Sequence, residues 1–508
     1  MSIEAGRRYT IGAVSTLFLA GVFVLRLHEA EPGLLYPDGY QYLLMAKGFA
    51  AHGRPLLTLG PHGDTLLPSA DAAAKPLFPA IVALFHLLGL TWFGAAKTVT
   101  ALAAACTGLL TGLLARRLTG SWLAAVVASS ACIASRELTF WSGFAGPDAL
   151  GEALALGSVL AFLGRRPRVG GVLAALAILA RPELALVALA AAAVGSSRRD
   201  LRRPTRDAAV AGVLSLAALL GILRPPLETP APAAILLGVL PAALAAAAFA
   251  ALTREGPRIL RLALVGVIAM IAFVAPLSGG AEGLRQWVQH DWSLVAAGAV
   301  GTAVAARSLR LRPALRMLLL AGAILLVAYG FKNPGSDRYL SLLTPLVALL
   351  ASFATATRVR LNDRAVALGV VGLIALTLAL PRLPARSSDP FPVVAAQLQA
   401  LQLPSLPFVT AAPDAYGTLV PGRSFVFARA GVRGLIIADG AQRAYDPSLL
   451  LRGRALATLD PGAGFVRPDG TLDRRPVRII LGTVSTCRLR ETACASRADT
   501  PRTSASRG

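Results

Sequence analysis

The sequence predicts an all-α polytopic membrane domain of about 12–13 transmembrane helices, followed by a small α/β domain outside the membrane. Of the 508 residues, 55% are hydrophobic and only 15% are charged, which is more apolar surface than water-soluble domains carry. Apolar runs long enough to cross a bilayer recur up to residue 381, and the tail lacks them. We therefore place the membrane domain at 1–381, the α/β domain at 382–495 and a disordered end at 496–508.

The apolar runs define the expected spans one by one. The first follows Arg7 and Arg8 and is interpreted as an uncleaved transmembrane helix, because no small-residue cleavage site precedes the further spans. Two short runs around Arg181-Pro182-Glu183 are either one kinked span or two half-length helices. The spans are expected near residues 9–27, 98–115, 121–138, 148–164, 169–181, 183–196, 207–223, 232–252, 259–276, 293–306, 314–330, 340–357 and 365–381.

The arginines predict the orientation of these spans. The net charge is +23, and with a cytoplasmic N-terminus every cationic cluster before the tail falls on the cytoplasmic side. This works if residues 28–97 form a long outward loop in which Pro76–Leu90 lies on or dips into the membrane surface. The same orientation places the tail, from about residue 382, on the outer side of the membrane. We expect a multi-pass protein of a bacterial inner (plasma) membrane, with no nucleic-acid partner, because the arginines punctuate apolar runs and do not gather on a polar face.

The tail alternates short β-like pieces with Pro, Gly and Asp turns, which is typical of a small α/β domain. Its cysteines, Cys487 and Cys494, are close enough in sequence for a local disulfide, and the reduced state is the open alternative. No metal site and no cofactor are expected. The pieces are Phe408–Ala411, Ser424–Phe427, Gly434–Ala438 and Val477–Gly482.

The outward loop carries the first candidate catalytic residue. Asp38 follows Pro37 just beyond the first span, where a carboxylate could meet both a lipid headgroup and an aqueous acceptor and act as a general base. The alternative is a helix N-cap, with Pro37 and Gly39 making the turn. Tyr40, two residues later, is a candidate contact to the acceptor or the sugar.

Three cations and a second acid are candidates for a phosphate-binding site. Lys75 stands beside the interfacial stretch, where it either holds a lipid phosphate or snorkels to the headgroups. Arg181 and Arg338 fall at the outward ends of spans and serve either a phosphate or their neighbours Glu183 and Asp337. Asp148 begins a span after Pro147, as a catalytic acid or only as a helix-start residue.

A polar loop with two tryptophans, Trp287 to Trp292, adds a possible sugar contact. Trp287 and His290 could stack on and bind a sugar face, and interfacial anchoring by tryptophan is the alternative.

The ordered set of these segments resembles the polytopic glycosyltransferases of the GT-C class, which include protein O-mannosyltransferases and lipid A aminoarabinose transferases. The matching segments run in a consistent order over roughly residues 1–380. They are Asp38-Gly39-Tyr40-Gln41-Tyr42, Lys75-Pro76-Leu77-Phe78-Pro79, Arg116-Arg117-Leu118-Thr119-Gly120, Pro147-Asp148-Ala149-Leu150, Arg181-Pro182-Glu183 and Asp337-Arg338-Tyr339-Leu340.

The resemblance implies inverting transfer of a sugar from a polyprenyl-phosphate donor to an acceptor glycan, lipid or protein on the outer face. In that family the acid matched by Asp38 activates the acceptor hydroxyl, and the lysine matched by Lys75 lies near the donor phosphate. The acid that often precedes this lysine is Ala74 here, so no second carboxylate role is expected at that position.

Two other functions remain as alternatives. A multi-span transporter or lipid flippase also has about a dozen spans and charges inside the membrane, although its outward loops tend to be short. A non-catalytic membrane scaffold with an outward binding domain is the third reading.

Overall fold

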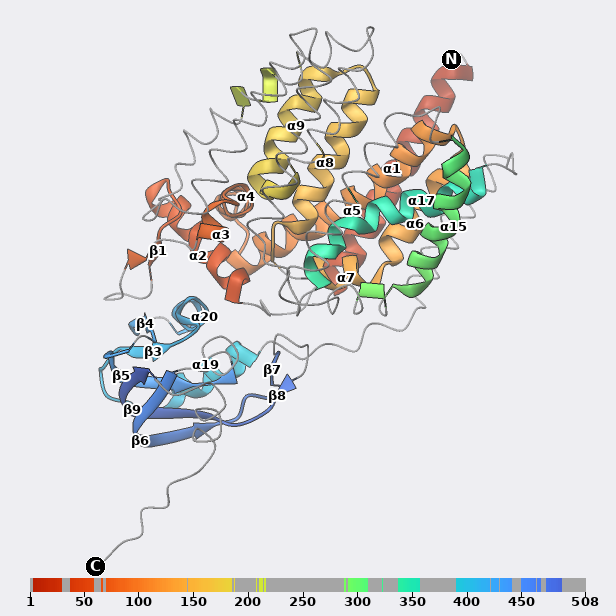
Figure 1. The fold of residues 1–508 in the computed structure, drawn as a ribbon. Coiled ribbons are helices and arrows are strands. Elements are labelled where there is room, and N and C mark those ends of the chain that lie inside the picture. Colours follow the sequence, from red (N-terminus) through yellow and green to blue (C-terminus); the bar gives the residue numbers. More distant parts are fainter. Residues whose placement is uncertain are drawn as a thin grey trace, which may run out of the picture. The chain divides into compact units, whose positions relative to one another are not determined.

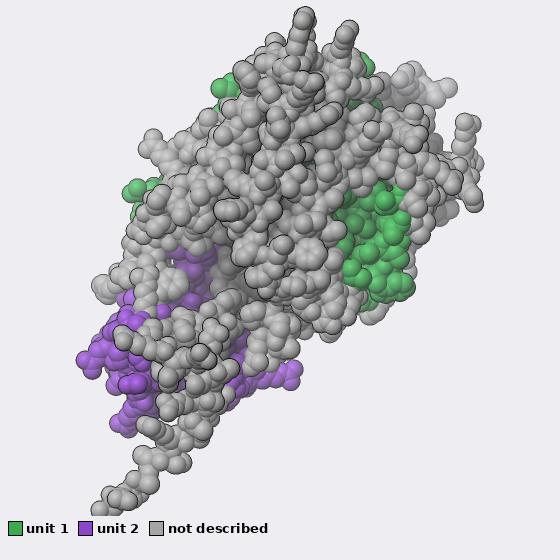
Figure 2. All heavy atoms as spheres, in the orientation of Figure 1, with its two compact units in different colours: residues 1–31, 45–55, 67–383 green, residues 32–44, 56–66, 384–508 purple. Residues whose placement is uncertain are grey.

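The chain forms two compact units in a computed structural model. Unit 1 comprises residues 1–31, 45–55 and 67–383, and unit 2 comprises residues 32–44, 56–66 and 384–508 (Figure 2). The structure describes residues 3–29, 37–58, 65–66, 70–143, 145–184, 287–288, 291–308, 337–356, 390–420, 422–428, 430–440, 449–462, 464–466 and 472–486, with a few isolated positions between 187 and 322.

The described part of unit 1 is helical (Figure 1). Its longest helix, α5, is apolar along its length and packs against α1, α6, α8 and α17. The helices are α1 (Ile3–Glu29), the end of α2 (Pro37–His52), α3 (Ala70–Ala73), α4 (Leu77–Leu87), α5 (Trp92–Thr119), α6 (Trp122–Ala134), α7 (Arg136–Ser142), α8 (Asp148–Leu163), α9 (Pro167–Ala180), η1 (Pro182–Leu184), α15 (Trp292–Ser308), η3 (Asp337–Leu343) and α17 (Thr344–Ala356).

Small residues bring α5 and α6 into close contact. A Cβ atom added at Gly112 would lie 2.7 Å from the carbonyl oxygen of Ala125, so the backbones could not approach this closely with a larger residue. Gly108 lies one turn earlier on α5, and the Ser129 hydroxyl donates to its carbonyl oxygen at 2.6 Å. This spacing of two glycines four residues apart is typical of helices that pack together inside a membrane.

The turn between α5 and α6 follows from its capping residues. Gly120 ends α5 in the left-handed region, at φ 78°, which glycine adopts without steric cost. Ser121 then caps α6, because its hydroxyl accepts a hydrogen bond from the Ala124 amide at 3.3 Å. Arg116, in the last turn of α5, lies 3.4 Å from the centre of the Trp122 ring.

Arg117 and the ion pair of Asp148 with Arg181 lie at different ends of the helices of unit 1. Arg117 near the end of α5 donates to the carbonyl oxygen of Leu163 at 2.9 Å, so α5 and α8 end side by side. The start of α8 meets the end of α9 through the ion pair of Asp148 with Arg181. Arg117 and the Asp148–Arg181 pair therefore lie at opposite ends of α8, and the predicted orientation in the membrane stays a prediction.

Helices are present where the sequence predicts spans near 9–27, 98–115, 148–164, 169–181 and 293–306. The prediction of one span at 121–138 is wrong, because α6 ends at Ala134 and α7 starts at Arg136. The Ser135 hydroxyl accepts from the Leu138 amide at 3.1 Å and thereby starts a new helix. The span predicted at 340–357 begins as η3 and becomes α-helical only at Thr344. The spans predicted at 183–196, 207–223, 232–252, 259–276, 314–330 and 365–381 lie almost entirely outside the described residues.

Among the described helices, α5 is the one that is long and apolar enough to cross a membrane by itself. Shorter apolar helices occur within α1, in α4, α6 and α9, and at 340–353. Leu84 and Leu87 in α4 and Leu88, the C-cap of that helix, are more than half exposed. This fits the prediction that the stretch from Pro76 to Leu90 lies against lipid, which remains a prediction.

Unit 2 contains a five-stranded mixed sheet in the order β4-β3-β5-β9-β6. Strands β4, β3 and β5 run parallel, and β9 is antiparallel to both β5 and β6. The elements are β1 (Leu57–Thr58), β2 (Thr65–Leu66), α19 (Pro390–Ala400), β3 (Phe408–Thr410), α20 (Pro413–Leu419), β4 (Phe425–Phe427), β5 (Arg433–Ala438), β6 (Leu449–Leu459), β7 (Phe465–Val466), β8 (Leu472–Asp473) and β9 (Val477–Thr486).

Strands β3, β4, β5 and β9 overlap the four segments that the sequence predicts to be extended. Their core is formed by residues such as Val409, Ile436 and Ile480, which point to one side of the sheet. The limits 382–495 of the α/β domain stay a prediction. Cys487 and Cys494 lie outside the described residues.

Part of the predicted outward loop belongs to unit 2. The rings of Tyr40, near the start of α2, and Phe391, in α19, meet edge to face with centroids 5.7 Å apart. Phe391 also contacts Tyr416 and Phe465 in the same way. The first turns of α2, which carry Asp38, are therefore held by the aromatic core of unit 2.

Candidate active site

A buried ion cluster forms at the junction of α8 and α9 in unit 1. Arg181 has no exposed surface, and its Nη1 atom pairs with Asp148 Oδ1. Its Nη2 atom lies 3.4 Å from Glu183 Oε1, and its Nε atom lies 3.4 Å from Glu183 Oε2. Two carboxylates thus surround one guanidinium, which is the compensation that a buried charge needs.

Local sequence explains why Arg181 can lie there. Pro182 cannot continue α9, so the helix ends at Ala180 and Arg181 takes an extended conformation as its C-cap. Gly151 makes space on α8, since a Cβ atom at that position would lie 3.2 Å from Cγ of Arg181 and 2.7 Å from Leu184. The pairing of Arg181 with Glu183 is one of the two alternatives that the sequence offers, whereas its pairing with Asp148, 33 positions away, is visible only in the fold.

Lys75 lies close to the same end of α9. It is buried, and Leu77, two residues later, packs against Ile178, Leu179 and Ala180 in the last turn of that helix. The structure therefore brings the segment after Lys75 to the end of α9 that precedes Arg181, and the phosphate-binding role of the two cations stays a prediction.

Asp38 is the second residue of α2, so it is not the N-cap that the alternative reading expects. A carboxylate in the first turn is nevertheless favoured by the helix dipole. Its side chain lies outside the described residues. Further along α2, Lys47 is half-buried, and burial lowers the pKa of its ammonium group from the usual value.

Two other predicted site residues are not placed by the structure. Arg338 belongs to η3, which packs against α7, α8 and α17, but its side chain is outside the described residues. His290 also lies outside them. Their roles stay predictions.

Trp287 is described and is buried, with 4% of its surface exposed. A buried ring has no free face on which a sugar could stack. The same loop contributes a structural residue that the sequence did not single out. The Asp291 carboxylate accepts hydrogen bonds from the Ser135 hydroxyl at 2.5 Å and from the Arg136 amide at 2.8 Å, and thus caps α7.

We expect Asp291→Ala to lower the free energy of unfolding by about 2–3 kcal/mol, because it removes a charged acceptor from two buried donors. Ser135→Ala should cost about 1 kcal/mol, since the amide contacts to Asp291 persist. Thermal unfolding of the purified variants measures both. Equal stability of Asp291→Ala and the native chain would contradict the assignment of this carboxylate as a cap.

Tyr40, like Trp287, is a predicted sugar contact whose ring is buried. Its ring has no exposed surface and packs on Phe391, so the structure shows it as a core residue of unit 2. A direct contact with acceptor or sugar remains a prediction from the sequence alone. The observed packing gives Tyr40 another effect on the site, because it fixes the first turn of the helix that carries Asp38.

Glu152 is the ionisable residue of this region that sequence reasoning missed. It follows Asp148 by four positions on α8, so both lie on one face of the helix, and it is buried. A carboxylate within a predicted span is itself a signal of function, and that rule could have found it. Among the described residues, no group of three or more His, Cys, Asp or Glu side chains could hold a metal ion.

No family model matches this chain, and no curated protein matches it. Among solved structures, it is similar to ArnT from Cupriavidus metallidurans in the apo state, with 14% identity, a TM-score of 0.42, and coverage of 93% of this chain and 98% of that chain. It is also similar to the same protein bound to undecaprenyl phosphate, with 15% identity, a TM-score of 0.40, and coverage of 92% and 98%. ArnT is an aminoarabinose transferase, one of the GT-C enzymes that the sequence motifs resemble.

Proposed function

We propose that this chain is an integral membrane glycosyltransferase that moves a sugar from a polyprenyl-phosphate donor to an acceptor on the outer face of the membrane. The observation that carries the proposal is the buried cluster of Arg181, Asp148 and Glu183 beside Lys75, at the end of the helices opposite to Arg117. Cations gathered at one membrane depth are suited to a departing lipid phosphate.

The proposed chemistry is one inverting displacement. Asp38 takes the proton of the acceptor hydroxyl, and the acceptor oxygen attacks the anomeric carbon from the face opposite to the phosphate. The new glycosidic bond forms as the bond from the anomeric carbon to the phosphate oxygen breaks, and the phosphate leaves with both electrons. Lys75, Arg181 and Arg338 stabilise that phosphate, while Asp148 holds Arg181 in position.

The proposal is tested with purified protein and a panel of polyprenyl-phosphate sugars. We expect one donor to be consumed, with release of the polyprenyl phosphate and transfer of the sugar to an acceptor, the anomeric configuration of the sugar being opposite to that in the donor. In proteoliposomes, movement of an intact donor between leaflets without any product would instead support a flippase.

The orientation can be tested separately. After replacement of the native cysteines, we expect single cysteines introduced at Gly60 and Ser448 to react with a membrane-impermeant thiol reagent from outside the cell. A cysteine introduced next to Arg117, at Thr119, serves as the cytoplasmic control and should react only after permeabilisation. If the cysteine introduced at Gly60 or at Ser448 reacted only after permeabilisation, both the predicted orientation and the outward active site would be rejected.

A further inference from the structure

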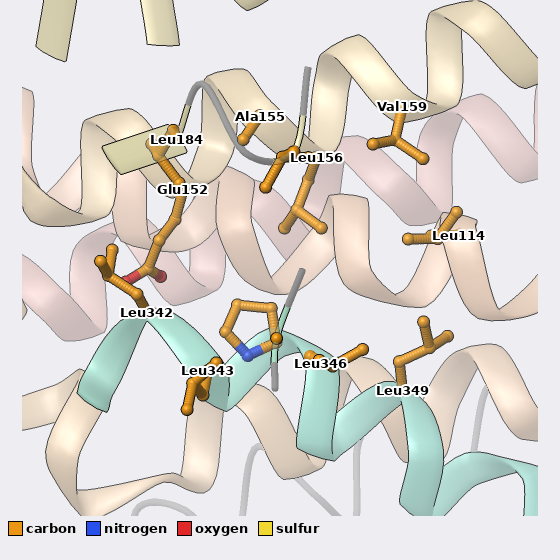
Figure 3. A pocket seen from close by; sticks show the side chains of 13 residues that line it. Leu114, Glu152, Ala155, Leu156, Val159, Leu184, Leu342, Leu343, Leu346 and Leu349 are labelled. Carbon is orange, nitrogen blue, oxygen red and sulfur yellow. The ribbon is translucent and has the colours of Figure 1, made fainter. Parts of the chain in front are cut away.

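A small cavity lies in unit 1 between α8, η1, η3 and α17 (Figure 3). Its volume is about 70 Å³, which is several times what one water molecule requires. The walls are almost entirely aliphatic and include Leu156, Leu184, Leu342, Leu343 and Leu346. Such walls favour apolar ligand groups, and among the described lining residues one side chain can bind a charged group.

The polar side chain in the lining is Glu152. Figure 3 shows its carboxylate directed into the cavity, between the leucines of η3 and α17. Only 3% of its surface is exposed, and neither carboxylate oxygen has a hydrogen-bond partner among the described residues. It is the one ionisable side chain among the described residues that line the cavity. An ionised carboxylate buried in this way is costly unless a partner binds it.

The charges nearby decide what kind of partner fits. Asp148, one turn earlier on α8, and Glu183, in η1, both pair with Arg181, so this guanidinium is already compensated by two carboxylates. Inside the cavity, an anion would face the Glu152 carboxyl group with no cation among the described lining residues, whereas a cation would be attracted by the ionised carboxylate.

We propose that this cavity is a binding site for a primary alkylammonium group. The ammonium donates to the two free oxygens of Glu152, and its short aliphatic chain packs on the leucines of η3 and α17. The proposal concerns a ligand of opposite charge to the donor phosphate and does not depend on sugar transfer. The ammonium can come from a free amine or from an amine-bearing lipid headgroup, and both present the same chemistry to Glu152.

The first test compares hexylammonium with hexanol, using the ligand-induced rise in the unfolding temperature of the full-length protein in detergent. We expect hexylammonium to bind the native protein, and Glu152→Gln to weaken that binding by roughly 10-fold or more, because a charged hydrogen bond is lost. Hexanol should bind both forms alike. Glu137→Gln is the matched control, since Glu137 is equally buried but accepts a hydrogen bond from Trp141 Nε1 at 2.9 Å.

The second test labels Glu152 with dicyclohexylcarbodiimide, an apolar reagent for buried carboxyl groups, and detects the adduct by mass spectrometry. Hexylammonium should block labelling in nanodiscs of phosphatidylglycerol. Blocking by phosphatidylethanolamine nanodiscs without added amine identifies a lipid headgroup as the source, and blocking only by hexylammonium identifies a free amine. Equal hexylammonium affinity in the native and Glu152→Gln proteins, or labelling that neither amine reduces, would overturn the proposal.

Discussion

Replacing Asp38 with asparagine should lower the rate of sugar transfer by about 10²–10⁴-fold, because the amide keeps the shape of the carboxyl group but cannot take up a proton. The fold should be little affected. Asp38 is the second residue of α2, and asparagine is tolerated at helix starts. Affinity for the polyprenyl-phosphate donor should also persist, since the proposed base acts on the acceptor and not on the donor. The measurement is the transfer rate at saturating donor, together with the unfolding temperature.

Asp64 provides the matched control for this prediction. It lies in the same predicted outward loop but outside the segments that resemble the GT-C class, so Asp64→Asn should keep the native rate. Asp148→Asn should have a smaller effect than Asp38→Asn if Asp148 only positions Arg181. Near-native turnover by Asp38→Asn would remove the general base from the mechanism and leave Asp38 as a residue of the helix start.

Phe391 links the start of α2, where Asp38 lies, to the rest of unit 2. It packs against Tyr40, and Tyr40 is two residues from Asp38 on the same helix. The sequence places Phe391 in the tail and Tyr40 in the first loop, and no local pattern links positions that far apart. Their contact shows that unit 2 includes the first turns of α2, which the predicted domain limits assign to the membrane domain alone.

The sequence was most informative where periodicity and composition determine structure locally. Long apolar runs predict α5 and α8, and alternating residues between turns predict β5 and β9, because each pattern repeats with the period of its own secondary structure. The break at Ser135 was not predicted. Its cap comes from Asp291, more than 150 positions away, and hydropathy continues unchanged across it.

In the candidate site, too, the sequence indicates contacts between near neighbours in the chain but not contacts between distant segments. Arg181 and Glu183 are two positions apart, so their pairing can be read from the chain. The pairing of Arg181 with Asp148 requires α8 and α9 to be adjacent, and only tertiary structure supplies that. Because Arg181 has two carboxylate partners, its proposed phosphate contact must compete with them. The next prediction separates these two roles.

Replacing Arg181 with methionine should lower the free energy of unfolding by about 3–5 kcal/mol, because it removes the buried cation that pairs with the buried carboxylate of Asp148. Glu183 is less affected, since its side chain is 19% exposed. In the double variant Arg181→Met/Asp148→Leu, both buried charges are removed, and most of the stability should return. The coupling between the two substitutions, measured by a double-mutant cycle of unfolding free energies, reports the strength of the pair.

The double variant then isolates the function of the guanidinium. If Arg181 also contacts the donor, the stable double variant should bind a polyprenyl phosphate roughly 10-fold more weakly than the native protein, because a charged hydrogen bond to phosphate is lost. Arg181→Lys should also weaken binding, since a compact ammonium cannot reproduce a bidentate contact. Combining Lys75→Gln with the double variant should then cost less than the sum of the separate losses, because both cations share one phosphate. Native affinity in the double variant would instead make Arg181 a purely structural partner of Asp148 and Glu183, and Lys75 would be left as the candidate phosphate ligand at that end of α9.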